Sequence, residues 1–225
     1  MPPLTVHHLQ VSQSERIPWL CEELGIEYEL KLYKRSPMLA PPEYKALHPA
    51  GSAPTIQDGE LTLAESAACV EYICHKFGNG KLFVKPSAPN YADFLYWFHS
   101  ANGTLQPGLS RGNMIKLSGI DVTKNQILTL FQERAMATVK MVDTRLKDND
   151  YLAGDELTAA DILSMWSFTD MRFWYPYSLE EYPNIQRYIK RISQREAYKK
   201  AMSKAEPDLK LALDIEPPKP FFAPS

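Results

Sequence analysis

Residues 49–66 read PAGSAPTIQDGELTLAES and place a proline, a hairpin turn and a helix start in close succession. Pro54 comes directly before the runs TIQD and ELTL, and in the interior of a paired strand its missing N–H would leave a gap in the ladder. A cis Ala53–Pro54 peptide is therefore predicted, which would bend the chain and aim the backbone of Ala53 into a cleft. Asp58-Gly59 supplies the positive φ values of a two-residue turn, so the two runs predict an antiparallel hairpin.

The same stretch ends at Glu65-Ser66, where a helix is predicted to begin. Free N–H groups and the positive end of the helix dipole attract a carboxylate at such a position. Glu65 would pair with an ammonium while Ser66 and the backbone N–H groups hold a neighbouring carboxylate, and together they would recognise an α-amino-acid headgroup. Taken alone, acidic and hydroxyl residues are also typical of an ordinary helix start.

The residues before this stretch predict a β-α-β unit. Residues 26–33 alternate apolar and polar side chains as a half-buried strand does, and residues 4–10 are a short strand candidate. Between them lies the apolar stripe of an amphipathic helix, which Gly25 closes. The stripe consists of Ile17, Leu20, Cys21 and Leu24. With the hairpin and a helix that ends at Gly78, residues 1–78 are predicted to form an α/β domain with a small mixed sheet.

The remainder of the chain lacks strand alternation. Residues 79–90 are interpreted as a linker, and residues 91–205 as an all-helical domain. Helices are predicted over 90–105, 123–147, 159–174 and 183–203. Thr158 and Asp161 have the spacing of a capping box, and Pro183 suits a first helical position. The tail, 206–225, contains five prolines and is expected to dock loosely.

Composition excludes several classes of protein. The chain has 225 residues, a formal net charge of −2 and a pI near 6.2, which does not indicate a nucleic-acid or anionic-membrane partner. Three cysteines without a C-x-x-C motif favour a reducing compartment. The N-terminus lacks a signal-peptide layout and no apolar run could span a bilayer, so a soluble, cytoplasmic protein is expected. No metal site is expected, because the adjacent His7 and His8 would face opposite sides of a strand.

The chain resembles the cytosolic glutathione transferases, in the serine-type fungal and bacterial branch. In the N-terminal half the resemblance rests on LTVHHLQVSQSERIPWLCEELG, APPEYKALHPAGSAPTI and LAESAACVEYI. In the C-terminal half it rests on YLAGDELTAADI and YPNIQRYIKRISQREAY. It covers about residues 4–203 with both domains in order. It implies a thioredoxin-like α/β N-terminal domain, an all-helical C-terminal domain and a homodimer.

The resemblance also implies a glutathione site on the N-terminal domain. Glu65 and Ser66 would hold the γ-glutamyl end, and the backbone of Ala53 would pair with the cysteinyl part. Ser12 matches the family's thiol-activating position, with Ser14 as the alternative. The full implied set is Ser12, Ser52, Ala53, Pro54, Glu65 and Ser66. Many relatives carry a basic residue or glutamine where this chain has Gly51-Ser52, so His48 or Lys34 would have to supply the charge that meets the glycine carboxylate.

The chemistry required of the serine is to ionise a thiol. A free thiol with a pKa of ~8.5 is only a few per cent thiolate at pH 7. Lowering that pKa by ~2 units requires about 2.7 kcal/mol of differential stabilisation. A hydroxyl that donates to sulfur beside a helix N-terminus would contribute this. The alternative role of Ser12 is a helix N-cap only, although Ser14 is the better cap candidate. Because no cysteine occupies position 12, conjugation is favoured over thiol–disulfide exchange.

The acceptor is expected to be a hydrophobic electrophile in the helical domain, since such pockets are mostly apolar with few polar groups. The candidate lining residues are Arg111, Asn113, Met114 and Trp174. Most of the aromatic cluster over 166–177 is interpreted as core. The predicted function is glutathione conjugation, either for detoxification or as a biosynthetic step. The alternatives are peroxidase, isomerase or ether-cleaving activity on the same thiolate.

A further alternative is a non-catalytic binding or regulatory member. It is motivated by Ser52 and by a basic stripe along the last predicted helix, which is otherwise interpreted as a solvated face. The stripe consists of Arg187, Lys190, Arg191, Arg195, Lys199 and Lys200.

Overall fold

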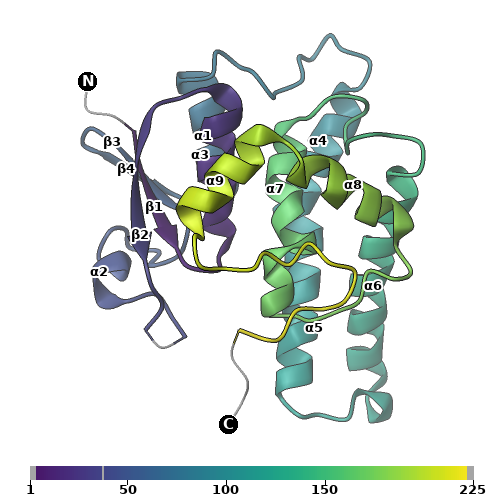
Figure 1. The fold of residues 1–225 in the computed structure, drawn as a ribbon. Coiled ribbons are helices and arrows are strands. Elements are labelled where there is room, and N and C mark those ends of the chain that lie inside the picture. The colour runs from purple at the N-terminus through teal and green to yellow at the C-terminus, as the bar shows by residue number, and fades with distance from the viewer. Residues whose placement is uncertain (1–3, 37, 222–225) are drawn as a thin grey trace. The chain divides into compact units, whose positions relative to one another are not determined.

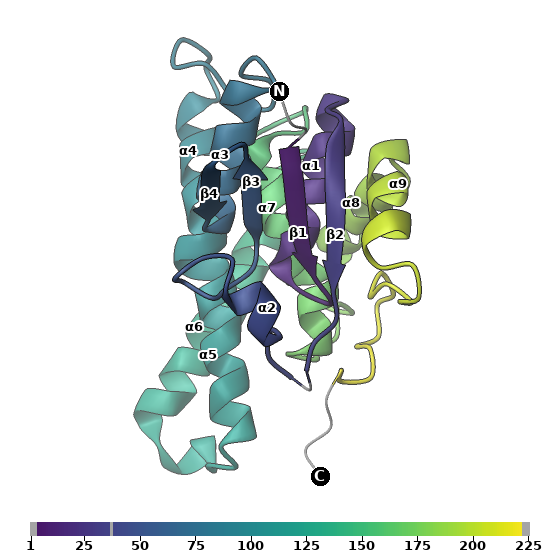
Figure 2. The ribbon, with the colours of Figure 1, turned by 90° about the vertical axis from the view of Figure 1, so that its left-hand side faces the viewer.

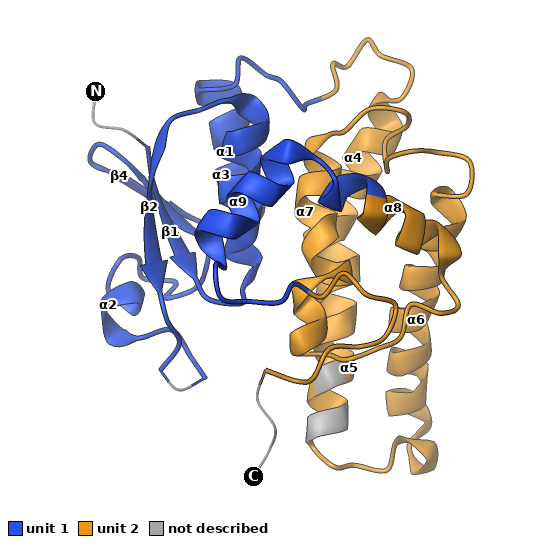
Figure 3. Ribbon diagram, in the orientation of Figure 1, with its two compact units in different colours: residues 1–83, 191–211 blue, residues 84–190, 212–225 orange. Residues whose placement is uncertain are grey.

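The computed structural model describes residues 4–36 and 38–221, apart from the side chains of residues 113, 116 and 117. The chain divides into two compact units, coloured separately in Figure 3. Unit 1 comprises residues 1–83 and 191–211, and unit 2 comprises residues 84–190 and 212–225. The first boundary falls within the predicted linker. Residues 191–205, which we predicted to belong to the helical domain, instead cluster with unit 1.

Unit 1 contains a four-stranded mixed sheet in the order β2-β1-β3-β4, seen face-on in Figure 2. β1 (Leu4–Leu9) pairs in parallel with β2 (Tyr28–Tyr33) and antiparallel with β3 (Thr55–Asp58), which pairs antiparallel with β4 (Leu61–Ala64). All six residues of β1 are buried because this strand is central and covered on both faces. β2, at the edge, keeps the predicted alternation over residues 28–31, but Leu32, predicted to face inward, is 51% exposed.

Helices cover both faces of this sheet. α1 (Arg16–Leu24) and α3 (Ser66–Lys76) lie on one face and α2 (Pro42–Lys45) on the other, as Figures 1 and 2 show. α1 ends at Gly25, whose φ of 67° is the left-handed conformation that favours glycine, so this predicted helix end is confirmed. α9 (Glu196–Ala205) packs against α1 and completes the unit.

The hairpin forms one residue later than predicted. Asp58 pairs with Leu61, so the turn residues are Gly59-Glu60 rather than Asp58-Gly59. Gly59 has a φ of 61°, which places the glycine at the first turn position, where positive φ is needed. Asp58 is therefore the last residue of β3, and its carboxylate accepts a 2.8 Å hydrogen bond from Tyr72 Oη of α3.

Unit 2 is helical over the part that the structure describes. Its elements run in chain order from residue 91, and α8 continues into unit 1 at residue 191. They are α4 (Tyr91–Ser100), the π-helical turn η2 (Ala101–Leu105), α5 (Gln106–Leu117), the short turn η3 (Val122–Lys124), α6 (Gln126–Arg145), α7 (Ala159–Phe168), the short turn η4 (Asp170–Phe173) and α8 (Pro183–Ser193).

Three helix predictions needed correction. α5 was missed because Pro107, Gly108 and Gly112 are poor helix formers, yet it follows η2 without a break. The helix predicted over 159–174 ends at Phe168, and 183–203 is two helices, α8 and α9.

The buried Asp161 and the half-buried Asp143 accept hydrogen bonds from the first residues of two helices of unit 2. The predicted capping box at Thr158 and Asp161 is confirmed: Thr158 N–H donates to Asp161 Oδ2 at 2.8 Å. Pro183 is the first residue of α8, as predicted. Asp143 of α6 accepts from the free N–H groups of Asn184 and Ile185 at 2.8 and 3.0 Å. These contacts satisfy donors that a helix start leaves unpaired.

The C-terminal segment is held rather than loosely docked, which corrects that expectation. The buried Arg172 guanidinium donates to backbone carbonyls of residues 212, 214, 215 and 216, at 3.4, 2.7, 2.9 and 2.7 Å. Phe221 N–H donates to Phe173 O at 2.9 Å. Core packing of most aromatic side chains over 166–177 is confirmed: Trp166, Phe168, Phe173 and Tyr177 are all buried.

Candidate functional site

Ser12 lies where the chain turns from β1 into the first helical turn of unit 1. It is the N-cap of the 3-10 turn η1 (Gln13–Glu15), and its Oγ accepts from Ser14 N–H at 3.2 Å. Ser12 itself therefore caps the turn, which corrects the preference for Ser14 as the cap. Val11, with a φ of 46°, holds the backbone in a left-handed conformation directly before it. This strained turn fixes the Ser12 hydroxyl at the helix start.

Ser14, the alternative thiol-activating residue, is fully buried, whereas Ser12 is 5% exposed. Ser14 Oγ accepts from Leu9 N–H at 3.0 Å, lies 2.7 Å from Ser12 Oγ and lies 2.9 Å from His8 Nδ1. His8 Nε2 in turn lies 2.9 Å from Glu206 Oε1. Of the two serines, Ser12 is the one nearer to solvent.

A second polar cluster surrounds the buried Arg16 of α1. Arg16 Nη1 donates to Gln13 Oε1 at 2.7 Å and to Ser66 Oγ at 2.8 Å. Gln13 Nε2 donates to the carbonyl of Ala53 at 3.0 Å. The predicted residues Ala53 and Ser66 are thus brought together, and Gln13 and Arg16 link them.

Two carboxylates act on the charge of Arg16. Burial lowers the pKa of Arg16 to about 9, and the charges of Glu15 and Glu65 oppose that shift. Two carboxylates therefore face one guanidinium. Glu15 is buried and Glu65 is exposed, so Glu65 is the carboxylate that a ligand ammonium can reach.

Glu65 has a backbone conformation that side-chain-bearing residues rarely adopt. Its φ is 76°, and it is the N-cap of α3, with Ser66 as the first helical residue. Non-glycine residues at positive φ cost free energy and cluster at ligand sites. The side chain is held outward while Ser66 Oγ, 1% exposed, points into the Arg16 cluster.

The loop before β3 carries the remaining predicted residues. The Ala53–Pro54 peptide is cis, as predicted. Ser52 is exposed and its carbonyl accepts from Thr55 Oγ1 at 3.3 Å. His48 Nδ1 accepts from Ala50 N–H at 3.1 Å. Lys45, which sequence reasoning did not consider, lies beside this loop: an atom at the Cβ position of Gly51 would be 3.7 Å from Lys45 Cγ.

The predicted acceptor residues of unit 2 do not all line one groove in the part of the chain that the structure describes. Arg111 lines a groove of about 430 Å³ together with Phe131, Arg134 and Met141. Met114 is 69% exposed, and neither it nor Trp174 belongs to the described lining of this groove. Trp174 packs against Phe221, with ring centroids 5.6 Å apart. The side chain of Asn113 lies outside the described residues.

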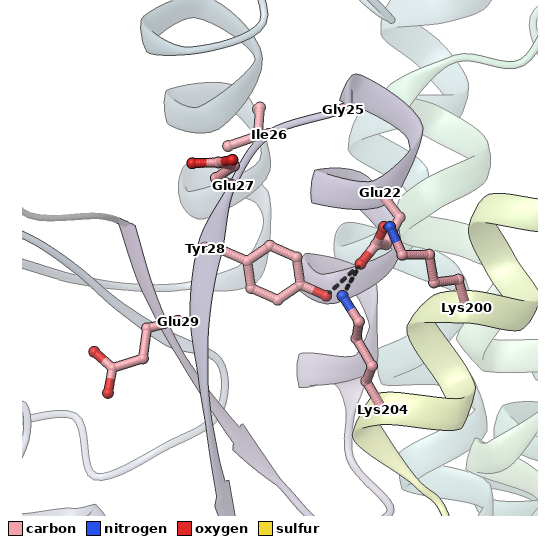
Figure 4. Close-up of a pocket in the computed structure, with 8 residues that line it drawn as sticks. All are labelled: Glu22, Gly25, Ile26, Glu27, Tyr28, Glu29, Lys200 and Lys204. Carbon is pink, nitrogen blue, oxygen red and sulfur yellow. Dashed lines mark hydrogen bonds and ion pairs between the residues drawn. The ribbon is translucent and has the colours of Figure 1, made fainter.

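A separate pocket of about 540 Å³ lies within unit 1, between the α1–β2 connection and α9 (Figure 4). Glu22 occupies its wall, paired with Lys200 and Lys204 at 2.6 Å each and with Tyr28 Oη at 3.0 Å. Burial opposes ionisation of Glu22, but hydrogen bonds from Lys200, Lys204 and Tyr28 outweigh it and lower the pKa. These lysines belong to a structural ion-pair network.

Part of the predicted basic stripe is likewise paired rather than simply solvated. Arg195 forms a two-pronged ion pair with Glu23 of α1, at 2.6 and 2.7 Å.

Three further observations limit the chemistry. Burial raises the pKa of both Cys69 and Cys74 to about 12, so these thiols are poor nucleophiles at neutral pH. Among the described residues, no group of three or more histidine, cysteine, aspartate or glutamate side chains is placed to hold a metal ion. None of the described helices combines the length and apolar character needed to cross a membrane.

The sheet order and the helices that flank it define a thioredoxin-like domain, and a helical unit follows it. The glutathione S-transferase N-terminal domain model matches residues 12–76, and the corresponding C-terminal domain model matches residues 121–196. Glutathione S-transferase 3 of Schizosaccharomyces pombe is 32% identical over 237 residues, covering 96% of each chain.

Solved structures agree with this match. A glutathione S-transferase from Actinobacillus pleuropneumoniae is 30% identical with a TM-score of 0.77, covering 90% of this chain and 93% of its own. A theta class enzyme from Xanthomonas axonopodis pv. citri, solved with glutathione bound, is 25% identical with a TM-score of 0.66, covering 89% and 97%. The chain belongs to the glutathione S-transferase family, as its motifs predicted.

Sequence reasoning missed four residues of these clusters. Gln13 and Arg16 follow Ser12 closely in the sequence. Arg16 is a charged residue directly before the apolar run of α1, and that position could have indicated it. His8 is a polar residue in a strand that is buried throughout, which is a similar signal. Glu206 lies 198 residues from His8 along the chain, and no local pattern indicates their contact.

Proposed function

We propose that this chain is a glutathione transferase in which Ser12 stabilises the glutathione thiolate and the thiolate attacks a hydrophobic electrophile. The observation that carries the proposal is the position of Ser12: its hydroxyl is fixed at the start of η1, in the same hydrogen-bonded segment as the Gln13, Ala53 and Ser66 cluster. The family to which the chain belongs supports the choice of glutathione as co-substrate.

The γ-glutamyl end of glutathione is assigned to the start of α3. Glu65 is exposed at the N-cap of α3, and its carboxylate would pair with the α-ammonium. Ser66 Oγ and the first free N–H groups of α3 would hold the α-carboxylate, since a helix N-terminus favours an anion. Arg16 fixes the Ser66 hydroxyl through its 2.8 Å hydrogen bond.

The cysteinyl and glycyl parts are assigned to the loop before β3. The backbone of Ala53, flanked by Ser52 and Pro54, would pair with the cysteinyl amide and carbonyl. The Ala53 carbonyl accepts from Gln13 Nε2 at 3.0 Å, and its second lone pair would accept from the cysteinyl amide. Lys45 lies beside Gly51 and is exposed, so it is our candidate for the glycine carboxylate in place of His48 or Lys34.

The thiol would then lie at Ser12, between the cysteinyl contact and the first helix. The Ser12 hydroxyl donates to the thiolate, and the N-terminal end of the η1–α1 segment adds a favourable electrostatic field. The serine hydroxyl is protonated in the complex. Stabilising the anion by ~2 pKa units, or about 2.7 kcal/mol, makes thiolate the major species at pH 7.

The acceptor is assigned to unit 2, with Arg111, Asn113, Met114 and Trp174 as the candidate lining. A homodimer and a cytoplasmic role in detoxification are the corresponding proposals for assembly and setting. A thermal-shift series with glutathione conjugates of increasing acceptor size tests the acceptor assignment. Conjugates that raise the melting temperature above the value with glutathione alone would outline the pocket, and Trp174→Ala should abolish that extra shift.

The central experiment compares Ser12→Ala with Ser203→Ala, an exposed serine of α9, in assays with a chloronitrobenzene, a hydroperoxide and an aryl ether. Ser12→Ala is expected to lower turnover about a hundredfold with the preferred substrate and to raise the pKa of the bound thiol toward ~8.5. Ser203→Ala should behave as wild type. The ranking of the three substrates separates conjugation from peroxidase or ether-cleaving activity. Retention on glutathione resin without turnover of any substrate would refute the enzymatic proposal in favour of a binding protein.

A further inference from the structure

Four buried side chains of unit 1 form a continuous hydrogen-bonded path inward from Ser12. We call Ser12, Ser14, His8 and Glu206 the proton path. Its three contacts are Ser12 Oγ–Ser14 Oγ at 2.7 Å, Ser14 Oγ–His8 Nδ1 at 2.9 Å and His8 Nε2–Glu206 Oε1 at 2.9 Å. Exposed fractions are 5%, 0%, 1% and 6% in that order, so water has little access to it.

The donors around Glu206 and His8 fix the direction of each hydrogen bond. Glu206 Oε1 also accepts from Val11 N–H, so this oxygen acts as an acceptor and His8 Nε2 must carry a proton. In the neutral imidazole the other nitrogen, Nδ1, is then an acceptor. Ser14 donates its proton to Nδ1 at 2.9 Å, the shorter of its two options, because the carbonyl of Leu9 lies at 3.4 Å.

The same reasoning sets the state of Ser12. Ser14 Oγ has used its proton on His8, so it accepts from Ser12, whose hydroxyl proton points inward. Ser12 Oγ also accepts from Ser14 N–H at 3.2 Å. With neutral His8, Ser12 therefore presents a lone pair to a ligand rather than a proton. In this state the Ser12 oxygen can accept a hydrogen bond from a thiol S–H, but it has no proton to donate to a thiolate.

We propose that the thiol proton of bound glutathione travels along the proton path to His8, which becomes an imidazolium paired with Glu206; this rests on the proposed function. The S–H bond breaks and its proton goes to Ser12 Oγ as the original Ser12 proton moves to Ser14 Oγ. The Ser14 proton moves to His8 Nδ1. Each of the three protons moves to the next atom of the path. Nothing is oxidised or reduced, and the net charge of the complex is unchanged.

The product state has the arrangement that the thiolate needs. His8 Nδ1–H now donates to Ser14, Ser14 donates to Ser12, and the Ser12 proton faces the sulfur anion. His8 does not touch the substrate and acts through two serines, in the way that a paired base activates a nucleophile in other enzymes. Glu206 stabilises the imidazolium at 2.9 Å.

The neighbouring His7 provides a contrast within the same strand. It is equally buried, but its nitrogens contact Tyr33 Oη at 2.9 Å and Gln57 Oε1 at 3.0 Å, and burial lowers its pKa. Neither partner carries a charge that would hold an imidazolium. Arg35 is a charged group near Glu206, and its guanidinium donates to the carbonyls of residues 10 and 11.

The test counts protons released when glutathione binds. Calorimetric titrations in two buffers of different ionisation enthalpy give the number released, and ultraviolet absorbance gives the thiolate formed. For the wild-type protein near pH 7 we expect thiolate to form with close to zero protons released. His8→Gln and Glu206→Gln are each expected to lower the thiolate fraction about tenfold, because the pKa of the bound glutathione thiol returns toward that of a free thiol. In both variants, every thiolate that still forms should release one proton to solvent.

His7→Gln is the matched control and should keep both wild-type values. In case His8→Gln does not fold, nitrogen-15 spectra of wild-type histidines are the second readout: the His8 signals should change from a neutral ring to an imidazolium when glutathione binds. One proton released per thiolate in the wild type, or an unchanged His8 spectrum, would overturn the proton path while leaving the proposed function intact. Wild-type protein that binds no glutathione would overturn both.

Discussion

Arg16 offers the sharpest test of how the candidate site is held together. Its guanidinium is 1% exposed and donates to Gln13 and Ser66. Methionine has a similar length and no charge, so Arg16→Met removes both hydrogen bonds while filling most of the volume. The buried Glu15, 3% exposed, then loses the positive charge that faces it.

The magnitude follows from what a buried charge loses with its partner. Burial lowers the pKa of Arg16 to about 9, and the charges of Glu15 and Glu65 oppose that shift, so the guanidinium and these carboxylates stabilise each other's charged forms. Arg16→Met leaves Glu15 as a buried charge with no guanidinium opposite, and breaking a buried charge pair in this way typically destabilises by about 3–5 kcal/mol net. We expect Arg16→Met to lower the free energy of unfolding by about 3 kcal/mol, and Arg16→Met with Glu15→Gln to recover most of that loss.

Urea unfolding of wild type, both single variants and the double variant gives the coupling energy directly. Glutathione affinity, measured by calorimetry, should fall at least tenfold in both proteins that carry Arg16→Met, because Ser66 loses the group that fixes its hydroxyl. The two readouts separate the charge pair from the ligand contact. If Arg16→Met alone were as stable as wild type, Glu15 would not depend on Arg16 and the electrostatic account of this cluster would be wrong.

Four smaller predictions follow from contacts described above. Glu22→Gln should destabilise unit 1 at pH 7. Because the pKa of Glu22 is lowered in the folded state, the stability that its carboxylate adds to wild type is lost as pH falls below ~4.3. Urea unfolding at pH 7 and at pH 3 should therefore show a smaller stability difference between wild type and variant at the lower pH. Arg172→Met removes the guanidinium from which four tail carbonyls accept, so limited proteolysis should cut near residues 212–216 well before it cuts wild type. Lys45→Ala should raise the KM for glutathione several-fold with kcat unchanged, and an unaltered KM would remove Lys45 from the glycine carboxylate. Gly25→Ala, at a φ of 67°, should cost about 1 kcal/mol in chemical denaturation, and no loss would mean that the helix end relaxes freely.

The order of elements in unit 1 was predictable because its signals are local. Alternation along β2 and the glycine after α1 act within a few residues, and both are present in the structure. α5 was missed for the opposite reason: its poor intrinsic propensity, from Pro107, Gly108 and Gly112, is overridden by tertiary packing against α6. Gly108 shows this packing, since its Cβ position would lie 3.7 Å from Ala135.

In the candidate site, too, some residues were predictable from local sequence motifs and others were not. Ser12, Ala53 and Ser66 belong to motifs that could be matched by eye, and the structure links Ala53 and Ser66 through Gln13. The connecting groups are set by three-dimensional contacts, as with Arg16 reaching Ser66 fifty residues away. The residues that line the groove beside Arg111 carry no local signal, because the apolar side chains of such a lining have the same pattern as any other helix face.

The contact between His8 and Glu206 also has a consequence for biosynthesis. β1 belongs to a unit whose last helix, α9, is synthesised nearly two hundred residues later. At a synthesis rate of about 5–20 residues per second, His8 waits roughly 10–40 s for its carboxylate partner. During that interval the nascent sheet lacks α9, so the thioredoxin-like unit is completed only after residue 206 has been added, and ribosome-stalled chains ending before residue 206 should remain sensitive to protease in β1.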